Sequence, residues 1–220
     1  MSKLYFLIYI IFISVMMTSC FPFAQYESAR TLGKGKGSIG VTGLGYLLYD
    51  PSSNLPNGKD YKPYGTAELA GGYGLTERSD IRLMMNTYGF TYLDFKHMLV
   101  GDKESTFALA SGLGVDANPF LILAQNPDPY FKINLPLFMS WHKSDKYFFV
   151  LPKLSYSLIF KSSHISKNTF VGMSFGGGFF LNNIEIYAGT GPTLHTSTFR
   201  ADNQLSLLWQ TGIGARYYIR

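Results

Sequence analysis

Bulky apolar residues alternate with small or polar residues along most of the chain from Gly37 onward. In the stretch 131–142 every odd position is large and apolar, while the even positions are mostly polar. Because successive side chains of a strand point to opposite faces, a period of two is typical of β-strands. The pattern predicts ten strands, at 37–49, 64–75, 80–88, 90–99, 105–116, 130–141, 146–159, 169–181, 184–198 and 204–219.

The connections between these strands alternate in length. Short connections at 76–79, 101–105, 143–145 and 182–183 alternate with longer ones at 50–63, 117–129 and 161–168. Short turns at one end and longer loops at the other are the pattern of outer-membrane barrels. The even strand number requires a very tight turn at 87–90, and it predicts that both ends of the barrel lie on the periplasmic side.

Alternation alone fits a soluble lipocalin-like barrel as well as a membrane barrel. Two strands carry only small residues on the face opposite the bulky one: Ala108, Ala110, Gly112, Gly114, Gly172, Ser174, Gly176 and Gly178. A soluble barrel would turn that face to water and carry Lys, Glu and Asp on it, whereas small residues suit a narrow lumen. The pattern therefore predicts an all-β, antiparallel, up-and-down transmembrane β-barrel of about ten strands over residues 37–220. The expected partners are the lipid bilayer and the barrel-assembly machinery.

Composition supports a membrane barrel. Aromatic residues make up 16% and charged residues 15% of the chain, against roughly 25% charged in ordinary soluble proteins. A group of aromatic residues falls toward strand ends or bulky faces, where interfacial girdles place such rings: Tyr46, Tyr49, Tyr73, Trp141, Tyr147, Phe148, Trp209 and Tyr217. The net charge of +5 is dispersed along the chain, so nucleic acid is not an expected partner.

The first residues form a signal peptide. Lys3 precedes an almost unbroken apolar run over 4–17, which as a helix would be about 21 Å long and too short for a ~30 Å hydrocarbon core. The end of this segment, Met17-Thr18-Ser19-Cys20, resembles the lipobox of bacterial lipoproteins, with Met17 where Leu is usual, and Cys20 is the only cysteine. The resemblance implies cleavage before Cys20 and its acylation by fatty acids such as palmitate. We therefore expect a lipoprotein signal peptide over 1–19 and a tether over 20–36 that is lipid-anchored on the periplasmic side of the outer membrane. The alternative is an ordinary signal peptide cleaved elsewhere, for instance after Ala24.

Two segments, Ala29-Arg30-Thr31-Leu32-Gly33-Lys34-Gly35 and residues 73–83, resemble features of small outer-membrane β-barrels of Gram-negative bacteria. The resemblance covers the mature chain as an architecture. Its motifs are turn and strand-entry features, so they imply no reaction.

Charged residues on the predicted lumen face are the main candidate site: Glu68, Arg82, Asp94, Lys96, Lys132, Lys153, Glu185 and Arg216. One interpretation is a salt-bridged, filled interior, because charges in a narrow barrel must be paired or hydrated. The other is a narrow, anion-leaning pore, because five of these eight residues are basic and lumen charges tune selectivity.

A catalytic site is not expected. His195 and Ser197 share one face of a strand and weakly resemble the His-x-Ser pair of outer-membrane lipid A deacylases. That chemistry also needs a carboxylate to orient the histidine, and only Asp202 in the following loop is near. The four histidines lie in different strands or loops without metal-ligand spacing, so neither a metal nor another cofactor is expected.

The sequence therefore favours an outer-membrane β-barrel lipoprotein that serves as a structural or interaction barrel with a filled lumen, whose extracellular partner is unknown. Three alternatives remain: a narrow anion-leaning pore, a membrane-embedded lipid-modifying enzyme, and a soluble lipocalin-like lipoprotein.

Overall fold

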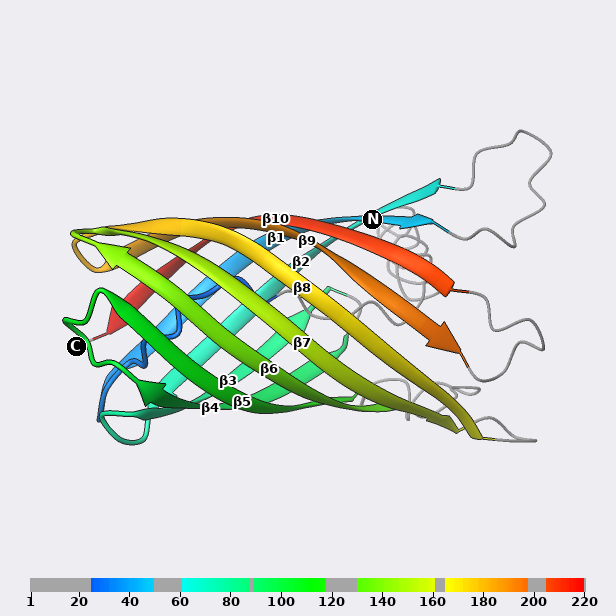
Figure 1. Ribbon diagram of the computed structural model, residues 1–220, viewed down its shortest axis with the longest axis horizontal. Coiled ribbons are helices and arrows are strands. Elements are labelled where there is room, and N and C mark those ends of the chain that lie inside the picture. Colours follow the sequence, from blue (N-terminus) through cyan, green and yellow to red (C-terminus); the bar gives the residue numbers. More distant parts are fainter. Residues whose placement is uncertain are drawn as a thin grey trace, which may run out of the picture.

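The chain folds into one closed antiparallel β-barrel (Figure 1) in a computed structural model that describes residues 25–49, 61–87, 89–117, 130–160, 165–197 and 205–219. Each strand pairs with its neighbours in sequence, and β1 closes the barrel against β10. The strands are β1 (Gly37–Tyr49), β2 (Tyr61–Gly74), β3 (Ser79–Asn86), β4 (Thr91–Val100), β5 (Phe107–Ala117), β6 (Tyr130–Lys143), β7 (Lys146–Phe160), β8 (Ile165–Leu181), β9 (Ile184–Ser197) and β10 (Leu205–Ile219).

The predicted ten-strand barrel is confirmed, with strand ends that differ by a few residues. The largest differences are at the starts of β2 and β8, which begin at Tyr61 and Ile165. The tight turn required at 87–90 is present: the Asn86 amide donates to the Phe90 carbonyl at 3.1 Å, and Gly89 takes a φ of 78°. Glycine adopts such a positive φ without the steric cost that other residues incur.

The barrel has two unlike ends. At the turn end, on the left of Figure 1, β1 begins, β10 ends, and residues 75–78, 101–106, 144–145 and 182–183 connect the strands. At the opposite end, called the loop end, the connections run through 50–60, 87–90, 118–129, 161–164 and 198–204; of these, only residues 87, 89 and 90 are described.

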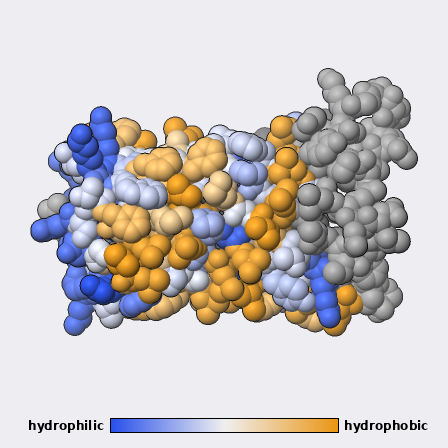
Figure 2. Space-filling view, in the orientation of Figure 1, coloured by the Kyte–Doolittle hydropathy of each residue, from blue (hydrophilic) through white to orange (hydrophobic). Residues whose placement is uncertain are grey.

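The face of the barrel drawn in Figure 2 is largely apolar along the strands and hydrophilic at the turn end. Large side chains at alternate strand positions point outward, among them Ile39, 60% exposed, and Leu135, 50% exposed. A contiguous apolar surface of this extent is not tolerated in water, so the wall matches one that faces hydrocarbon and not the outside of a lipocalin-like soluble barrel. Within the described ranges, no helix is long and apolar enough to cross a membrane.

The interior holds small, polar and aromatic side chains. Ala108 and Ala110 are fully buried there. The predicted aromatic girdle is wrong for Tyr46 and Tyr147, which are buried in the interior cluster. Both share their strand's inward parity, and the Tyr147 hydroxyl donates a hydrogen bond to Glu185 on β9, two strands away. The other described members of the predicted girdle face outward: Tyr73, Trp141, Phe148, Trp209 and Tyr217. The side chain of Tyr49 lies outside the described part of the chain.

Candidate functional site in the barrel lumen

The N-terminal segment before β1 lies inside the barrel. Residues 25–32, called the plug here, form neither a helix nor a strand, and the chain bends at Ala29. Most of the plug is nearly inaccessible to solvent: Gln25, Tyr26, Glu27, Ser28, Ala29 and Thr31 are each 7% exposed or less. The predicted tether over 20–36 therefore includes a segment that lies in the lumen, a position that the residue pattern does not indicate.

A tight turn over residues 33–36 connects the plug in the lumen to the start of β1 at the turn end. The Gly35 amide donates to the Gly74 carbonyl at 2.8 Å, and the Gly74 amide donates back to the Lys36 carbonyl at 2.9 Å. Gly33 and Gly35 have φ values of 85° and 76°, a conformation that costs other residues about 1–2 kcal/mol. The Gly-Lys-Gly-Lys sequence thus permits the reversal that seats the plug.

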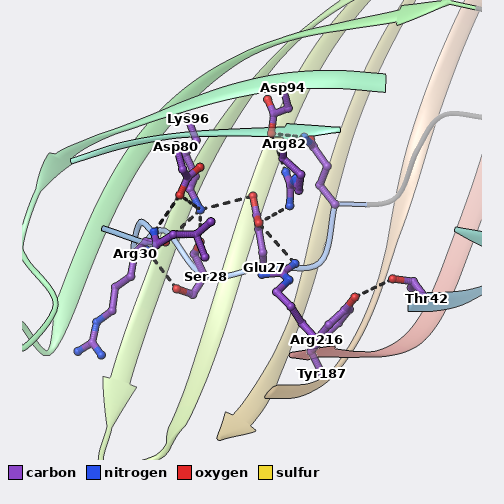
Figure 3. Close-up of polar contacts among 12 residues, drawn as sticks. Glu27, Ser28, Arg30, Thr42, Asp80, Arg82, Asp94, Lys96, Tyr187 and Arg216 are labelled. Carbon is purple, nitrogen blue, oxygen red and sulfur yellow. Dashed lines mark hydrogen bonds and ion pairs between the residues drawn. The ribbon is translucent and has the colours of Figure 1, made fainter. Parts of the chain in front are cut away.

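Glu27 is the centre of the plug (Figure 3). Its carboxylate accepts a hydrogen bond from Arg82 on β3 and lies 3.6 Å from the Lys96 ammonium on β4. The Arg216 guanidinium, from β10, is also 3.6 Å away. Three cations from three strands therefore converge on one carboxylate.

The same cations also have acidic partners in the barrel wall. The Arg82 guanidinium donates to the Asp94 carboxylate at 2.6 Å, and the Lys96 ammonium lies 3.6 Å from the Asp80 carboxylate. Arg216 lies 3.2 Å from Glu185. Because each cation keeps a partner in the wall, the wall alone remains largely neutralised, and Glu27 adds a second, shared partner.

The protonation of Glu27 follows from these contacts. Burial raises the pKa of its carboxyl, but the positive charges of Arg82, Lys96 and Arg216 lower it by more, so the pKa falls from an ordinary 4.5 to about 2. The carboxyl is therefore ionised at neutral pH, and its charge is part of what holds the plug.

The plug backbone is also bound by the wall. The Lys96 ammonium donates to the Arg30 carbonyl at 3.0 Å, and the Ala29 amide donates to the Ser140 hydroxyl at 3.0 Å. The Leu32 amide donates to the Asp80 carboxylate at 3.0 Å. Buried backbone groups need such partners, and β3, β4 and β6 supply them here.

Tyr26 fills a gap that glycines leave in the wall. A Cβ atom at Gly189 would lie 2.4 Å from the Tyr26 ring, and one at Gly212 would lie 2.6 Å from it. The ring also packs on Phe149, with centroids 6.2 Å apart. At the N-terminal end of the plug, the Gln25 side-chain amide donates to the Tyr92 hydroxyl at 2.6 Å and to Asp94 at 3.1 Å. The plug thus reaches deep into the lumen.

The structure places all eight predicted lumen residues in the interior. Their exposed fractions are 8% or less: Glu68, Arg82, Asp94, Lys96, Lys132, Lys153, Glu185 and Arg216. Arg82, Lys96 and Arg216 meet at Glu27, as described above. Lys132 belongs to a second group farther from the turn end, where its ammonium lies 3.5 Å from Asp116 and 5.2 Å from the centroid of the Phe170 ring.

Three buried interior acids were not among the predicted lumen residues: Glu27, Asp80 and Asp116. With them, the described residues include six buried acidic side chains and five buried basic ones. The excess of basic residues on which the anion-leaning pore was based is therefore absent among the described interior residues, where acidic and basic side chains are nearly equal in number. Asp80 lies two residues before Arg82, and Asp116 lies two residues after Gly114. Because residues two apart in a strand share a face, the alternation itself predicts that both aspartates point into the lumen. Glu27 precedes the first strand and has no such signal.

Other predicted sites lie outside what the structure describes. The signal peptide over 1–19 and Cys20 precede the first described residue, and the side chains of His195 and Ser197 are not among the described ones. Over the described parts of the chain, no group of three or more His, Cys, Asp or Glu residues could hold a metal ion.

The fold is that of known outer-membrane proteins, although the sequence matches no family model and no curated protein. Among solved structures, the chain is similar to an outer membrane channel from Pseudomonas putida F1, with 12% identity, 90% of this chain and 100% of that chain covered, and a TM-score of 0.52. It is also similar to the outer membrane protease OmpT from Escherichia coli, with 8% identity, coverage of 93% and 100%, and a TM-score of 0.45. A third similar structure is Ail, the attachment invasion locus protein of Yersinia pestis, with 12% identity, coverage of 84% and 99%, and a TM-score of 0.35. At these identities the likeness concerns the fold alone. The closed barrel, its apolar wall and the first of these structures together identify the fold as that of a bacterial outer-membrane β-barrel.

Proposed function

We propose that the protein is a plugged β-barrel of the bacterial outer membrane, a structural or interaction barrel whose lumen is closed by its own N-terminal segment. The observation that carries this proposal is the ionised Glu27 carboxylate among Arg82, Lys96 and Arg216. Side chains of the wall and the plug pack together inside the barrel and are buried there, which favours a scaffold over an open channel. The proposal assigns no catalytic role to the barrel.

The orientation follows from the lengths of the connections. Short turns face the periplasm in outer-membrane barrels, so the turn end and the mouth through which the plug enters would face the periplasm. The loop end would then present its longer connections to the outside, where an interaction partner would bind. Insertion into the bilayer would require the barrel-assembly machinery.

Conductance in planar bilayers tests the closed lumen. The full-length wild type should conduct little, whereas Glu27→Lys should open it, because a fourth cation at this position is repelled by the three already there. Glu104→Lys is the matched control, since Glu104 is exposed at the turn end and belongs to none of the ion pairs among the described residues. A heat-dependent shift on a detergent gel shows that each variant is folded. An openly conducting wild type would overturn the proposal, as would a folded Glu27→Lys barrel that stays closed.

A pore that opens when the plug withdraws is the second candidate. It is favoured by a cavity of about 190 Å³ at the turn end, lined by Ser28 and Arg30 of the plug and by Phe180 and Tyr218 of the wall. Spontaneous, reversible opening of wild-type channels would support it. Because the interior charges balance, such openings should show little preference for anions over cations.

We also propose that Cys20 is acylated, and the plug limits where that lipid can lie. Gln25 is bound deep in the lumen, and the five residues from Cys20 to Gln25 span at most about 18 Å. The chain itself uses residues 25–33 to travel from that depth to the rim. A lipid on Cys20 would thus reach the periplasmic leaflet only after the plug has withdrawn.

Labelling cells with a radioactive or clickable palmitate tests the anchor. We expect label in the wild type and none in Cys20→Ser, and we expect the Cys20→Ser barrel to be closed for a larger fraction of time. If the mature protein carries no lipid, or begins at Gln25 by mass spectrometry, the lipid anchor is refuted and the plugged barrel is unaffected.

A further inference from the structure

The wall of the lumen holds the plug in the way that a protein binds a peptide. Part of the binding goes to the peptide backbone: Lys96 donates to two plug carbonyls, at 3.4 Å and 3.0 Å, and Ser140 and Asp80 each accept from a plug amide. Backbone contacts of this kind give affinity without regard to sequence. They would be available to any chain lying along the same path.

Other contacts select particular side chains. The cluster of Arg82, Lys96 and Arg216 suits a carboxylate, because charge-assisted hydrogen bonds to a carboxylate are roughly twice as strong as neutral ones. The space left by Gly189 and Gly212 accepts an aromatic ring one residue earlier.

The position two residues after the carboxylate accepts only a small side chain. Ala29 is 0% exposed and belongs to the same buried cluster as Ala108, Ala110 and Phe138. Adding methylene groups to a side chain in a well-packed interior forces strain on its neighbours. The site therefore selects an aromatic residue at the position of Tyr26, an acidic residue at that of Glu27 and small residues after it.

The contacts to residues 25–32 are noncovalent, and the plug joins the barrel only through the 33–36 turn at the rim. The cavity of about 190 Å³ adjoins the plug at the same mouth. A segment bound in this way can be exchanged for a similar one, since the wall recognises its chemistry and not its attachment.

We propose that the lumen is a peptide-binding site which residues 25–32 occupy in cis. When the plug withdraws, the site takes a segment of another polypeptide in which an aromatic residue precedes Glu and two small residues follow. This inference rests on the proposed function, because it requires that the plug can leave. Attachment through a short turn gives the plug an effective concentration in the millimolar range, so the wild-type barrel binds such peptides weakly.

Fluorescence polarisation in detergent micelles tests the site. The probe is a fluorescent peptide with the sequence of residues 25–34, and the control probe is the same peptide carrying E27Q. The protein is the full chain with Glu27→Lys, whose own plug is repelled from the site, with Glu27→Gln as the substitute if the lysine variant does not fold. We expect this protein to bind the acidic probe at least about tenfold more tightly than the control probe, and at least about tenfold more tightly than the wild type does.

The outcomes separate this inference from the proposed function. If Glu27→Lys conducts but binds both probes equally, or neither, the peptide site is refuted while the plugged barrel stands. If free glutamate displaces the acidic probe as well as an unlabelled copy of that peptide does, the site recognises small carboxylates, and the peptide inference is refuted. If Glu27→Lys and Glu27→Gln both stay closed and neither binds the probe, the plug does not leave the lumen and both proposals fail.

Discussion

Glu27→Gln tests how much the buried carboxylate contributes to seating the plug. The substitution keeps the size and shape of the side chain and removes its charge. Breaking a buried ion pair costs about 3–5 kcal/mol. Arg82 keeps its bond to Asp94, and Arg216 keeps its pair with Glu185. The loss should therefore lie at the lower end, about 3 kcal/mol, and because 1.4 kcal/mol is a factor of ten, the unseated population should rise about 100-fold.

A single cysteine in the plug measures that population. Cys20 is the only cysteine in the chain, so Ser28→Cys in a Cys20→Ser background provides one reporter, at a position that is 7% exposed. Its reaction with a water-soluble maleimide follows the open population when opening and closing are fast.

We expect Glu27→Gln to speed this reaction about 100-fold. Glu104→Gln, which removes an exposed charge at the same end of the barrel, should change it by less than about threefold, because surface substitutions of this kind are usually within about 0.5 kcal/mol. A change below about threefold for Glu27→Gln would refute the reasoning, as would an equal effect of the two substitutions.

Three further predictions concern the turn, the aromatic gap and pH. Gly35→Ala should raise the labelling rate of the Ser28→Cys reporter by about 5–30-fold, because a Cβ there meets no atom within 4 Å and the cost is the positive φ alone, about 1–2 kcal/mol. Gly189→Ala should lower the temperature of the heat-dependent gel shift, since its Cβ would lie 2.4 Å from the Tyr26 ring and overpacking costs about 1–3 kcal/mol. Conductance at pH 5 should match that at pH 7 and rise only as the pH falls from 4.5 toward about 2. A carboxyl whose pKa is lowered in the seated state stabilises that state fully above its ordinary pKa, and this stabilisation is lost when the carboxyl is protonated. Opening already at pH 5 would contradict the assignment of Glu27.

The barrel was predictable from sequence because its strands obey one simple rule. Inward and outward side chains alternate over 13–17 residues in the longer strands, so the apolar wall and polar lumen are both visible in the residue order. The same parity would have assigned Asp80, Asp116, Tyr46 and Tyr147 to the lumen. The two aspartates were missed because they lie near strand ends, and the two tyrosines were misplaced because aromatic residues were grouped by type instead of by face.

The plug was not predictable in the same way. Residues 25–32 have no period of two, and their place is set by partners on β3, β4, β6 and β10 that lie far away in the sequence. A polar segment rich in small residues next to a Gly-rich turn is typical of a linker. Only the closed barrel brings Arg82, Lys96 and Arg216 close enough to bind one carboxylate.

A disulfide between the plug and the wall tests most directly whether residues 25–32 lie in the lumen. The Ala29 amide is 3.0 Å from the Ser140 hydroxyl, so Ala29→Cys with Ser140→Cys, in a Cys20→Ser background, should form a disulfide on mild oxidation of folded protein in membranes. The control pair, Ala29→Cys with Ala188→Cys, should form none, because Ala188 is exposed on the outside of the wall. The account predicts a crosslink in the first pair alone. Absence of that crosslink, together with rapid maleimide labelling of the Ser28→Cys reporter, in which Ala29 is unchanged, would show that the segment lies outside the barrel and would contradict the plugged lumen.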